Sequence, residues 1–251
     1  MGDAALLYQQ AKRTWIIAWK DIRVYYSKGP VVIFGILFPI FLLLSFAVGR
    51  DLSLGFLMPG LLGMVLFFTA TSISPAVAPW ETQARTLERL MSSPLTTYTI
   101  ILGDIVASFV FGVLISLIPV SVAVGLGMPI SHLPVLLLGI LLAGFCFSSL
   151  GLIFSAAPTS MPSTIMMISA LVKFPVVFIS GIFIPVEQLP EWGRIISFIS
   201  PLTYFTDIAR HCFQNQGYLP LEIDFLVLAA FTVLFLLFAL KIHERTMPKR
   251  I

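Results

Sequence analysis

The sequence predicts an all-α polytopic membrane protein with six transmembrane helices, and two observations carry this prediction. First, 58% of the 251 residues are apolar and only 11% are charged, whereas a soluble domain carries roughly 25% charged residues. Second, long uncharged runs match the thickness of a lipid bilayer. Because the backbone finds no water inside a bilayer, each crossing segment must be a helix that satisfies its own hydrogen bonds.

Six apolar stretches are suited to crossing the membrane. They cover residues 31–48, 57–78, 99–124, 133–154, 163–184 and 225–240. The last stretch is short, but the stem of Lys241 can run along the acyl chains and extend it. Only Asp104 and Lys173 place a charge inside any stretch. Residues 31–251 are therefore expected to form the transmembrane domain.

Residues 1–30 are expected to form a separate N-terminal amphipathic helix at the membrane interface. At helical spacing one stripe collects apolar and aromatic side chains, namely Tyr8, Trp15, Trp19, Ile22 and Tyr26. Arg13, Lys20 and Arg23 turn away from that stripe. Aromatic rings and the charged ends of basic side chains both interact favourably with the lipid headgroup layer, so the helix is expected to anchor the chain there. It is either a plain membrane anchor or an anchor that also contacts a cytoplasmic partner. No cleavable signal is expected, and residues 31–48 would serve as the insertion signal.

The loop between the second and third stretches predicts a short amphipathic helix. Four charged residues fall on one helical face, namely Glu81, Arg85, Glu88 and Arg89, and three apolar residues fall on the other, namely Leu87, Leu90 and Met91. Glu81 precedes Arg85 by four residues, which favours an ion pair. Pro94 then ends the helix. The loop is either a helix with a free charged face or a solvated connector.

The loop between the fifth and sixth stretches, residues 185–224, is apolar yet interrupted by charges. Pro185, Pro190 and Pro201 cut it into short pieces. Such pieces are typical of re-entrant helices, which non-spanning backbone can form only where protein or a cavity covers it. These outer helices would cap a translocation path, or else form a plug against lipid.

The distribution of basic residues predicts the orientation. An even number of spans puts both termini on one side, and that side holds eleven basic residues, namely Lys12, Arg13, Lys20, Arg23, Lys28, Arg85, Arg89, Lys241, Arg245, Lys249 and Arg250. The other side holds Arg50, Arg194 and Arg210. The excess marks the cytoplasm, so both termini of a multi-pass protein of the cell membrane are expected inside. The pI near 9 then reflects topology and lipid headgroups, and no nucleic acid is expected as a partner.

Motifs for chemistry are absent from the sequence. There is no G-x-S-x-G, H-E-x-x-H or C-x-x-C, and the histidines at 132, 211 and 243 lie in different segments, so no catalytic, cofactor or metal site is expected. Cys146 and Cys212 fall at different depths, so they are not expected to form a disulfide. The phosphate-binding loop is also missing. Any ATP hydrolysis must therefore occur on another chain.

Three segments together resemble the membrane subunit of ABC type-2 exporters, the permeases of drug, lipid and polysaccharide export. They are TLERLMSSP at 86–94, SGIFIP at 180–185 and SPLTYFTDIAR at 200–210. The resemblance implies a homodimer of permeases bound to two ABC ATPase subunits, which would hold the ATP and Mg and drive alternating access. The four charged residues of the 79–98 loop, Glu81, Arg85, Glu88 and Arg89, would dock on the ATPase. Asp104 follows Gly103 where family members often carry a basic residue.

Two other function classes are compatible with an apolar chain that crosses the membrane. One is an intramembrane lipid-modifying enzyme, and the other is a carrier or channel that needs no ATPase. Under the transporter interpretation, Lys173 and Asp104 are the candidate translocation-path residues, because a charge inside a span is costly and needs a partner. Lys173 would pair with Asp104 or with an anionic substrate group. Otherwise it would snorkel inward or bind carbonyls freed by Pro175.

Overall fold

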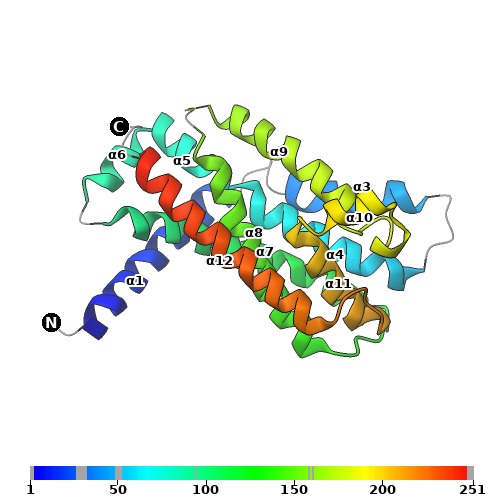
Figure 1. Ribbon diagram of the computed structural model, residues 1–251. Coiled ribbons are helices and arrows are strands. Elements are labelled where there is room, and N and C mark those ends of the chain that lie inside the picture. Colours follow the sequence, from blue (N-terminus) through cyan, green and yellow to red (C-terminus); the bar gives the residue numbers. More distant parts are fainter. Residues whose placement is uncertain are drawn as a thin grey trace.

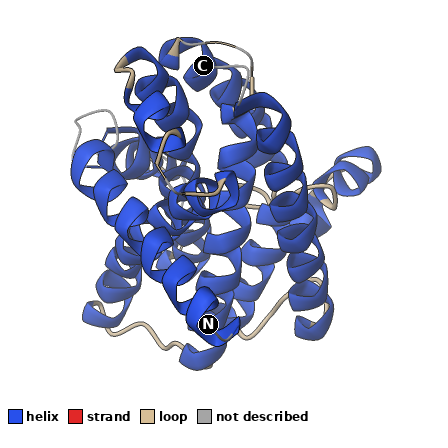
Figure 2. Cartoon of the chain, turned by 90° about the vertical axis from the view of Figure 1, so that its left-hand side faces the viewer, coloured by secondary structure: helices blue, strands red, loops and turns tan. Residues whose placement is uncertain are grey.

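The computed structural model describes residues 3–26, 33–48, 53–93, 95–157, 159 and 161–247. Throughout these residues every regular element is a helix, which confirms the all-α prediction (Figure 2). The predicted boundary between residues 1–30 and 31–251 falls outside the described residues.

Within the described residues, five helical segments are long and apolar enough to cross a membrane, so the chain is a multi-pass membrane protein. The first consists of α4 (Leu54–Ser72) and α5 (Ser74–Gln83), and the others are α7 (Thr97–Gly125), α8 (Leu133–Ser155), α9 (Pro162–Ile179) and α12 (Leu221–Thr246). The first predicted stretch, 31–48, holds only a shorter apolar helical segment, built from η2 (Ile33–Leu37) and α3 (Phe38–Ala47). Five of the six predicted spans are therefore confirmed as helices of spanning length, and the span at residues 31–48 stays a prediction.

Several helix ends differ from the predicted ones. Helix α9 ends at Ile179, although the fifth stretch was expected to continue to residue 184. The reason is Gly181, whose φ of 73° turns the chain out of the helix, a conformation that costs glycine little. Helix α12 covers Leu221–Thr246 and is therefore longer than the predicted 225–240. It begins directly after Pro220, and at its other end the polar residues after residue 240 are still helical.

Short helices follow α9, each starting at one of the predicted prolines. They are η3 (Val186–Gln188) after Pro185, α10 (Glu191–Ser197) after Pro190, and α11 (Pro201–Gln214). Helix α11 packs against α4, α8 and α12. Figure 1 shows α10 and α11 at the end of the bundle away from α6 (Thr86–Met91).

The main core lies where α4, α8 and α11 meet. Phe147 of α8 makes edge-to-face contacts with Phe67 of α4 and Phe205 of α11, at centroid distances of 5.1 and 6.3 Å. Aromatic pairs prefer this geometry. Helix α11, which has only 14 residues, is thus packed into the main core at the end of the bundle away from α6.

The N-terminal segment is helical, as predicted, but it does not present a single stripe. It consists of α1 (Asp3–Asp21) followed by η1 (Ile22–Tyr26). Tyr8, Trp15 and Trp19 are exposed, whereas Tyr26 is buried and its hydroxyl donates a hydrogen bond of 2.7 Å to Oγ of Ser108 in α7. The segment projects from one side of the bundle at its free end (Figure 1).

Helix α1 crosses α7 closely because of a glycine. A Cβ at Gly103 would lie 2.5 Å from Cγ2 of Ile17, so any larger residue there would push α1 away. Ile17 is buried in this crossing. The close approach brings the end of α1 beside Asp104, the next residue of α7.

Candidate functional site

Lys173 is buried within α9, with 6% of its surface exposed. Its ammonium group donates a hydrogen bond of 2.6 Å to the carbonyl oxygen of Thr71 in α4. A lysine in an apolar span needs such a partner, because an unpaired charge there is costly. Lys173 therefore connects α9 to the end of α4.

The Thr71 carbonyl is available because of Pro75. In a continuous helix the N–H of residue 75 would bond the carbonyl of residue 71, but proline has no N–H. Helix α4 accordingly ends at Ser72, and α5 starts again at Ser74. Lys173 supplies the missing donor.

The same arrangement occurs at the opposite end of α4. Pro59 lies inside this helix and removes the donor for the carbonyl of Gly55. Nε2 of Gln214 in α11 donates to that carbonyl at 2.8 Å. Two prolines thus create two backbone acceptors, and side chains of α9 and α11 occupy them.

The predicted pairing of Lys173 with Asp104 is wrong, and so is the alternative at Pro175. Lys173 does bind a freed carbonyl, but that carbonyl lies in another helix and is freed by Pro75. Asp104 lies elsewhere, beside the end of α1. From one sequence the depth of each charge can be predicted, but not which helices are neighbours.

Hydroxyl groups surround the break between α4 and α5. Thr69 and Thr71 donate to the carbonyls of Val65 and Phe67, and Ser72 donates to that of Phe68. Bonds of this kind to the preceding turn favour bending. Helix α8 lies against the break at Gly151, where a Cβ would lie 2.4 Å from Oγ of Ser74. The break is therefore closely packed despite its irregular backbone.

A second cluster joins α1 to α5 and α7. Lys20 forms ion pairs with the neighbouring Asp21, at 2.9 Å, and with Glu81 of α5. The Asp21 carboxyl also lies close enough to Asp104 of α7 to interact with it. Tyr25 stacks on Trp80 beside these groups, with ring centroids 5.4 Å apart. One ammonium group thus faces three buried carboxyl groups.

The electrostatics of this cluster follow from burial and charge. Burial by itself lowers the pKa of Lys20, but the carboxylates of Asp21 and Glu81 outweigh burial and hold that pKa above its ordinary value. Burial raises the pKa of the Asp21 carboxyl, although Lys20 opposes this. The ammonium group is therefore strongly held as a cation, and it connects α1 electrostatically to α5.

The predicted charged face on the 79–98 loop is only partly formed. Glu81 is 1% exposed and faces Lys20, so the expected pairing of Glu81 with Arg85 and the free position of Glu81 are wrong. The reason is the left-handed backbone of Arg85, with a φ of 53°, which separates α5 from α6. Glu81 and Arg85 therefore do not lie on one helix. Arg85, Glu88 and Arg89 are exposed and Leu87 is buried, as predicted.

Sequence reasoning missed the involvement of Lys20 and Asp21. Lys20 was expected to point away from the apolar stripe, toward solvent and headgroups, yet it points at Glu81. One signal was present: Glu81 directly follows an apolar span and Trp80, where a carboxylate needs a cation. Because its partner is 61 residues away, spacing within one helix could not identify it.

Comparison with known proteins gives a consistent result. A family model described as "ABC-2 type transporter" matches residues 12–213. The chain is similar to the probable multidrug ABC transporter permease YbhR of Escherichia coli K12, with 22% identity over 169 residues that cover 64% of this chain and 44% of that protein.

Two further relatives come from the same organism. The inner membrane transport permease YhhJ is 27% identical over 170 residues, covering 66% of this chain and 45% of its own length. The inner membrane transport permease YadH is 23% identical over 191 residues, which cover 76% of this chain and 74% of that protein. The match spans less than half the length of YbhR and YhhJ. The Lys20 cluster, the Lys173 contact and α6 all lie within residues 12–213.

Proposed function

Because this chain belongs to the ABC-2 type transporter family, we propose that it is a transport permease, the membrane subunit of an ABC exporter driven by a separate ATPase chain. The family match over residues 12–213 is the observation that carries this proposal. Proteins of this family normally work with an ATPase subunit. The ATP and Mg would be bound by that partner, and transport would proceed by alternating access in a homodimer of permeases.

The proposed substrate is a drug, a lipid or a glycan, moved across the cell membrane. The relative YbhR is named as a probable multidrug permease, which supports a drug as the first substrate class to test. The exposed apolar side chains of α9 and α12, such as Leu171 and Leu226, suit contact with lipid or with a second permease.

We propose six spans with both termini in the cytoplasm. The span not yet accounted for would be formed by residues 31–48, which include the apolar helical segment Gly35–Ser45. Helix α6 and the end of α12 lie at the same end of the bundle (Figure 1), and that end carries Arg85, Arg89 and Arg245. This clustering supports a cytoplasmic position for it. Helices α10 and α11 would then be the outer re-entrant helices.

We propose that α5 and α6 act as a lever. The exposed residues Arg85, Glu88 and Arg89 would dock on the ATPase, while Glu81 is tied to α1 through Lys20. At its other end α5 meets α4 at the Pro75 break, where Lys173 binds. A movement of α6 would thus reach α1 through an ion pair and α9 through the Lys173 contact.

The Pro75 break is the proposed hinge of this lever. It lacks one helical hydrogen bond and is surrounded by hydroxyl groups that can change partners. A lysine on a flexible stem can follow a moving carbonyl. ATP drives transport only if it binds the two states with different affinity, and bending here would distinguish the two states.

The decisive experiment is purification of the full chain from its native membrane in mild detergent. We expect a stoichiometric second polypeptide that mass spectrometry identifies by a G-x-x-x-x-G-K-[ST] loop, with ATPase activity that vanishes without the permease. A chain that purifies alone and transports in proteoliposomes without ATP would instead be a carrier or a channel.

A further inference from the structure

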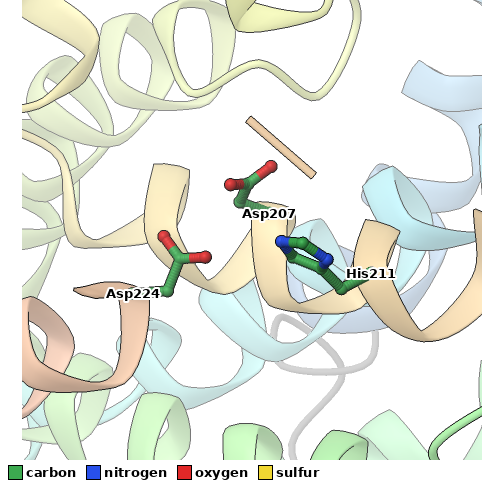
Figure 3. A group of neighbouring side chains, drawn as sticks. All are labelled: Asp207, His211 and Asp224. Atoms are coloured by element: carbon green, nitrogen blue, oxygen red, sulfur yellow. The ribbon is translucent and has the colours of Figure 1, made fainter. Parts of the chain in front are cut away.

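Asp207 and His211 of α11 and Asp224 of α12 meet at the end of the bundle away from α6. Their ligand atoms all lie within 4.8 Å of one another. Figure 3 shows the three side chains converging from two helices. In metal sites the ligand distances are about 2.0–2.2 Å, so a small inward movement would let all three groups contact one ion.

Asp224 is the part of this cluster that its surroundings leave unexplained. It is completely buried, with 0% of its surface exposed. Neither of its carboxylate oxygens has a hydrogen-bond donor among the described residues, and the polar group beside it is another carboxyl group, that of Asp207. A buried carboxyl group without a partner costs free energy. Its position in the first turn of α12 favours negative charge but supplies it with no donor.

The other two residues are already held in place by the backbone. Both oxygens of Asp207 accept hydrogen bonds from the N–H groups of Tyr218 and Leu219, at 2.8 to 3.0 Å. A nitrogen of the His211 ring contacts the carbonyl oxygen of Leu219 at 2.7 Å. Because a carboxylate has about four acceptor positions, Asp207 keeps one for a further partner. The turn between α11 and α12 thus orients both side chains.

The negative charge of the Asp207 and Asp224 carboxylates favours a cation between them. Two carboxylates at this spacing repel each other unless a proton or a cation lies between them. The nearby Arg210 interacts electrostatically with Asp207, but its guanidinium group donates to the carbonyl of Gly181 and lies over the ring of Phe56, so it does not lie between the two carboxylates. A divalent ion would neutralise both carboxylates at once.

We propose that Asp207, His211 and Asp224 bind a divalent transition-metal ion, with Zn²⁺ as the first candidate. A mixed set of one imidazole and two carboxylates favours zinc and its neighbours over Mg²⁺ or Ca²⁺, which prefer oxygen ligands alone. Water would complete the coordination. The ion would clamp α11, which is central to the core, to the first turn of α12.

No metal site was expected from the sequence, because the three histidines are far apart. That reasoning overlooked the carboxylates. Asp207 and His211 are four residues apart on one helix, a spacing that places them on the same face, but Asp224 joins them only through the turn at residues 215–220.

The test is zinc binding by the untagged full chain in detergent or nanodiscs. We expect metal analysis after dialysis to find about one Zn²⁺ per chain, and ZnCl2 added to metal-stripped protein to raise the melting temperature. Asp224→Asn and His211→Gln should each weaken binding at least tenfold. Glu222→Gln and His132→Gln, exposed residues at the same end, are the matched controls and should bind like the wild type.

Two outcomes would overturn the proposal. Zinc that leaves the wild-type melting temperature unchanged, while Asp224→Asn raises it without metal, would show that the two carboxyl groups share a proton. Binding that both Asp224→Asn and His211→Gln leave intact would place the metal elsewhere. Neither result bears on ATPase association, so this proposal and the transporter assignment fail separately.

Discussion

The ammonium group of Lys173 in α9 lies 2.6 Å from the carbonyl oxygen of Thr71 in α4, and Pro75 is the reason that this oxygen is free. A proline that interrupts a helix and the carbonyl that it leaves without a helical donor thereby form one unit with a buried lysine 102 residues away from that carbonyl. The unit joins α9 to the junction of α4 and α5.

Lys173→Met should destabilise the protein by about 1–3 kcal/mol, because it leaves the buried Thr71 carbonyl without a donor. Pro75→Ala in the same chain restores an N–H at residue 75 and should recover much of that loss. Thermal unfolding in detergent measures both effects. A double variant as unstable as Lys173→Met alone would contradict this account, and Asp104→Asn should give no rescue.

Pro75→Ala by itself tests the hinge. With the helical bond to Thr71 restored, the junction of α4 and α5 should stiffen, so transport should fall severalfold while expression and ATPase association stay normal. Pro59→Ala is a useful control, since it restores the helical hydrogen bond that Pro59 removes within α4, where Gln214 donates to the freed carbonyl of Gly55. Equal transport losses from both variants would argue against a special role for Pro75.

Lys20→Met should loosen α1 from the bundle. The change removes the ammonium group that faces three carboxyl groups, at an expected cost of about 1–3 kcal/mol, which is below the value for a fully buried pair because the Lys20 side chain is 32% exposed. Faster proteolysis of α1 in detergent would report the loss. Lys12→Met, at an exposed position of the same helix, should have no effect, and Glu81→Gln should partly offset Lys20→Met.

Reversing the exposed charges of α6 should weaken ATPase docking. Glu88→Arg combined with Arg89→Glu keeps the net charge but inverts the surface that we propose for the partner, so the ATPase recovered in a pull-down should fall severalfold with unchanged membrane insertion. Glu191→Arg, exposed at the other end of the bundle, is the control. The docking role would be lost if the α6 variant retained its partner fully.

Thiol labelling tests the orientation. Cysteine at Gln188, in a background without Cys146 and Cys212, should react with an impermeant reagent in intact cells, whereas cysteine at Glu88 should react only after lysis. Both positions are exposed. Background from Cys212 should be low even if it is kept, because burial raises the pKa of its thiol to about 11. The reverse labelling pattern would invert the proposed topology.

Composition and hydropathy alone determined that this chain is helical and crosses a membrane several times, and where the long helices run. This was possible because a bilayer allows only self-bonded helices in such a chain, and their length is set by its thickness. The prolines that start η3, α10 and α11 were also visible in the sequence, since proline interrupts a helix wherever it lies. Helical periodicity correctly predicted that Glu88 and Arg89 of α6 are exposed and that Leu87 is buried.

The tertiary structure alone decided which charges meet. Asp104 and Lys173 are the two charges that the sequence places inside spans, and the natural inference was to pair them. In the fold Asp104 instead lies in the Lys20 cluster, Lys173 donates to the Thr71 carbonyl, and Asp224 lies beside Asp207 and His211. Hydropathy determines the depth of a helix in the membrane, but close packing at residues such as Gly103 and Gly151 determines which helices are neighbours.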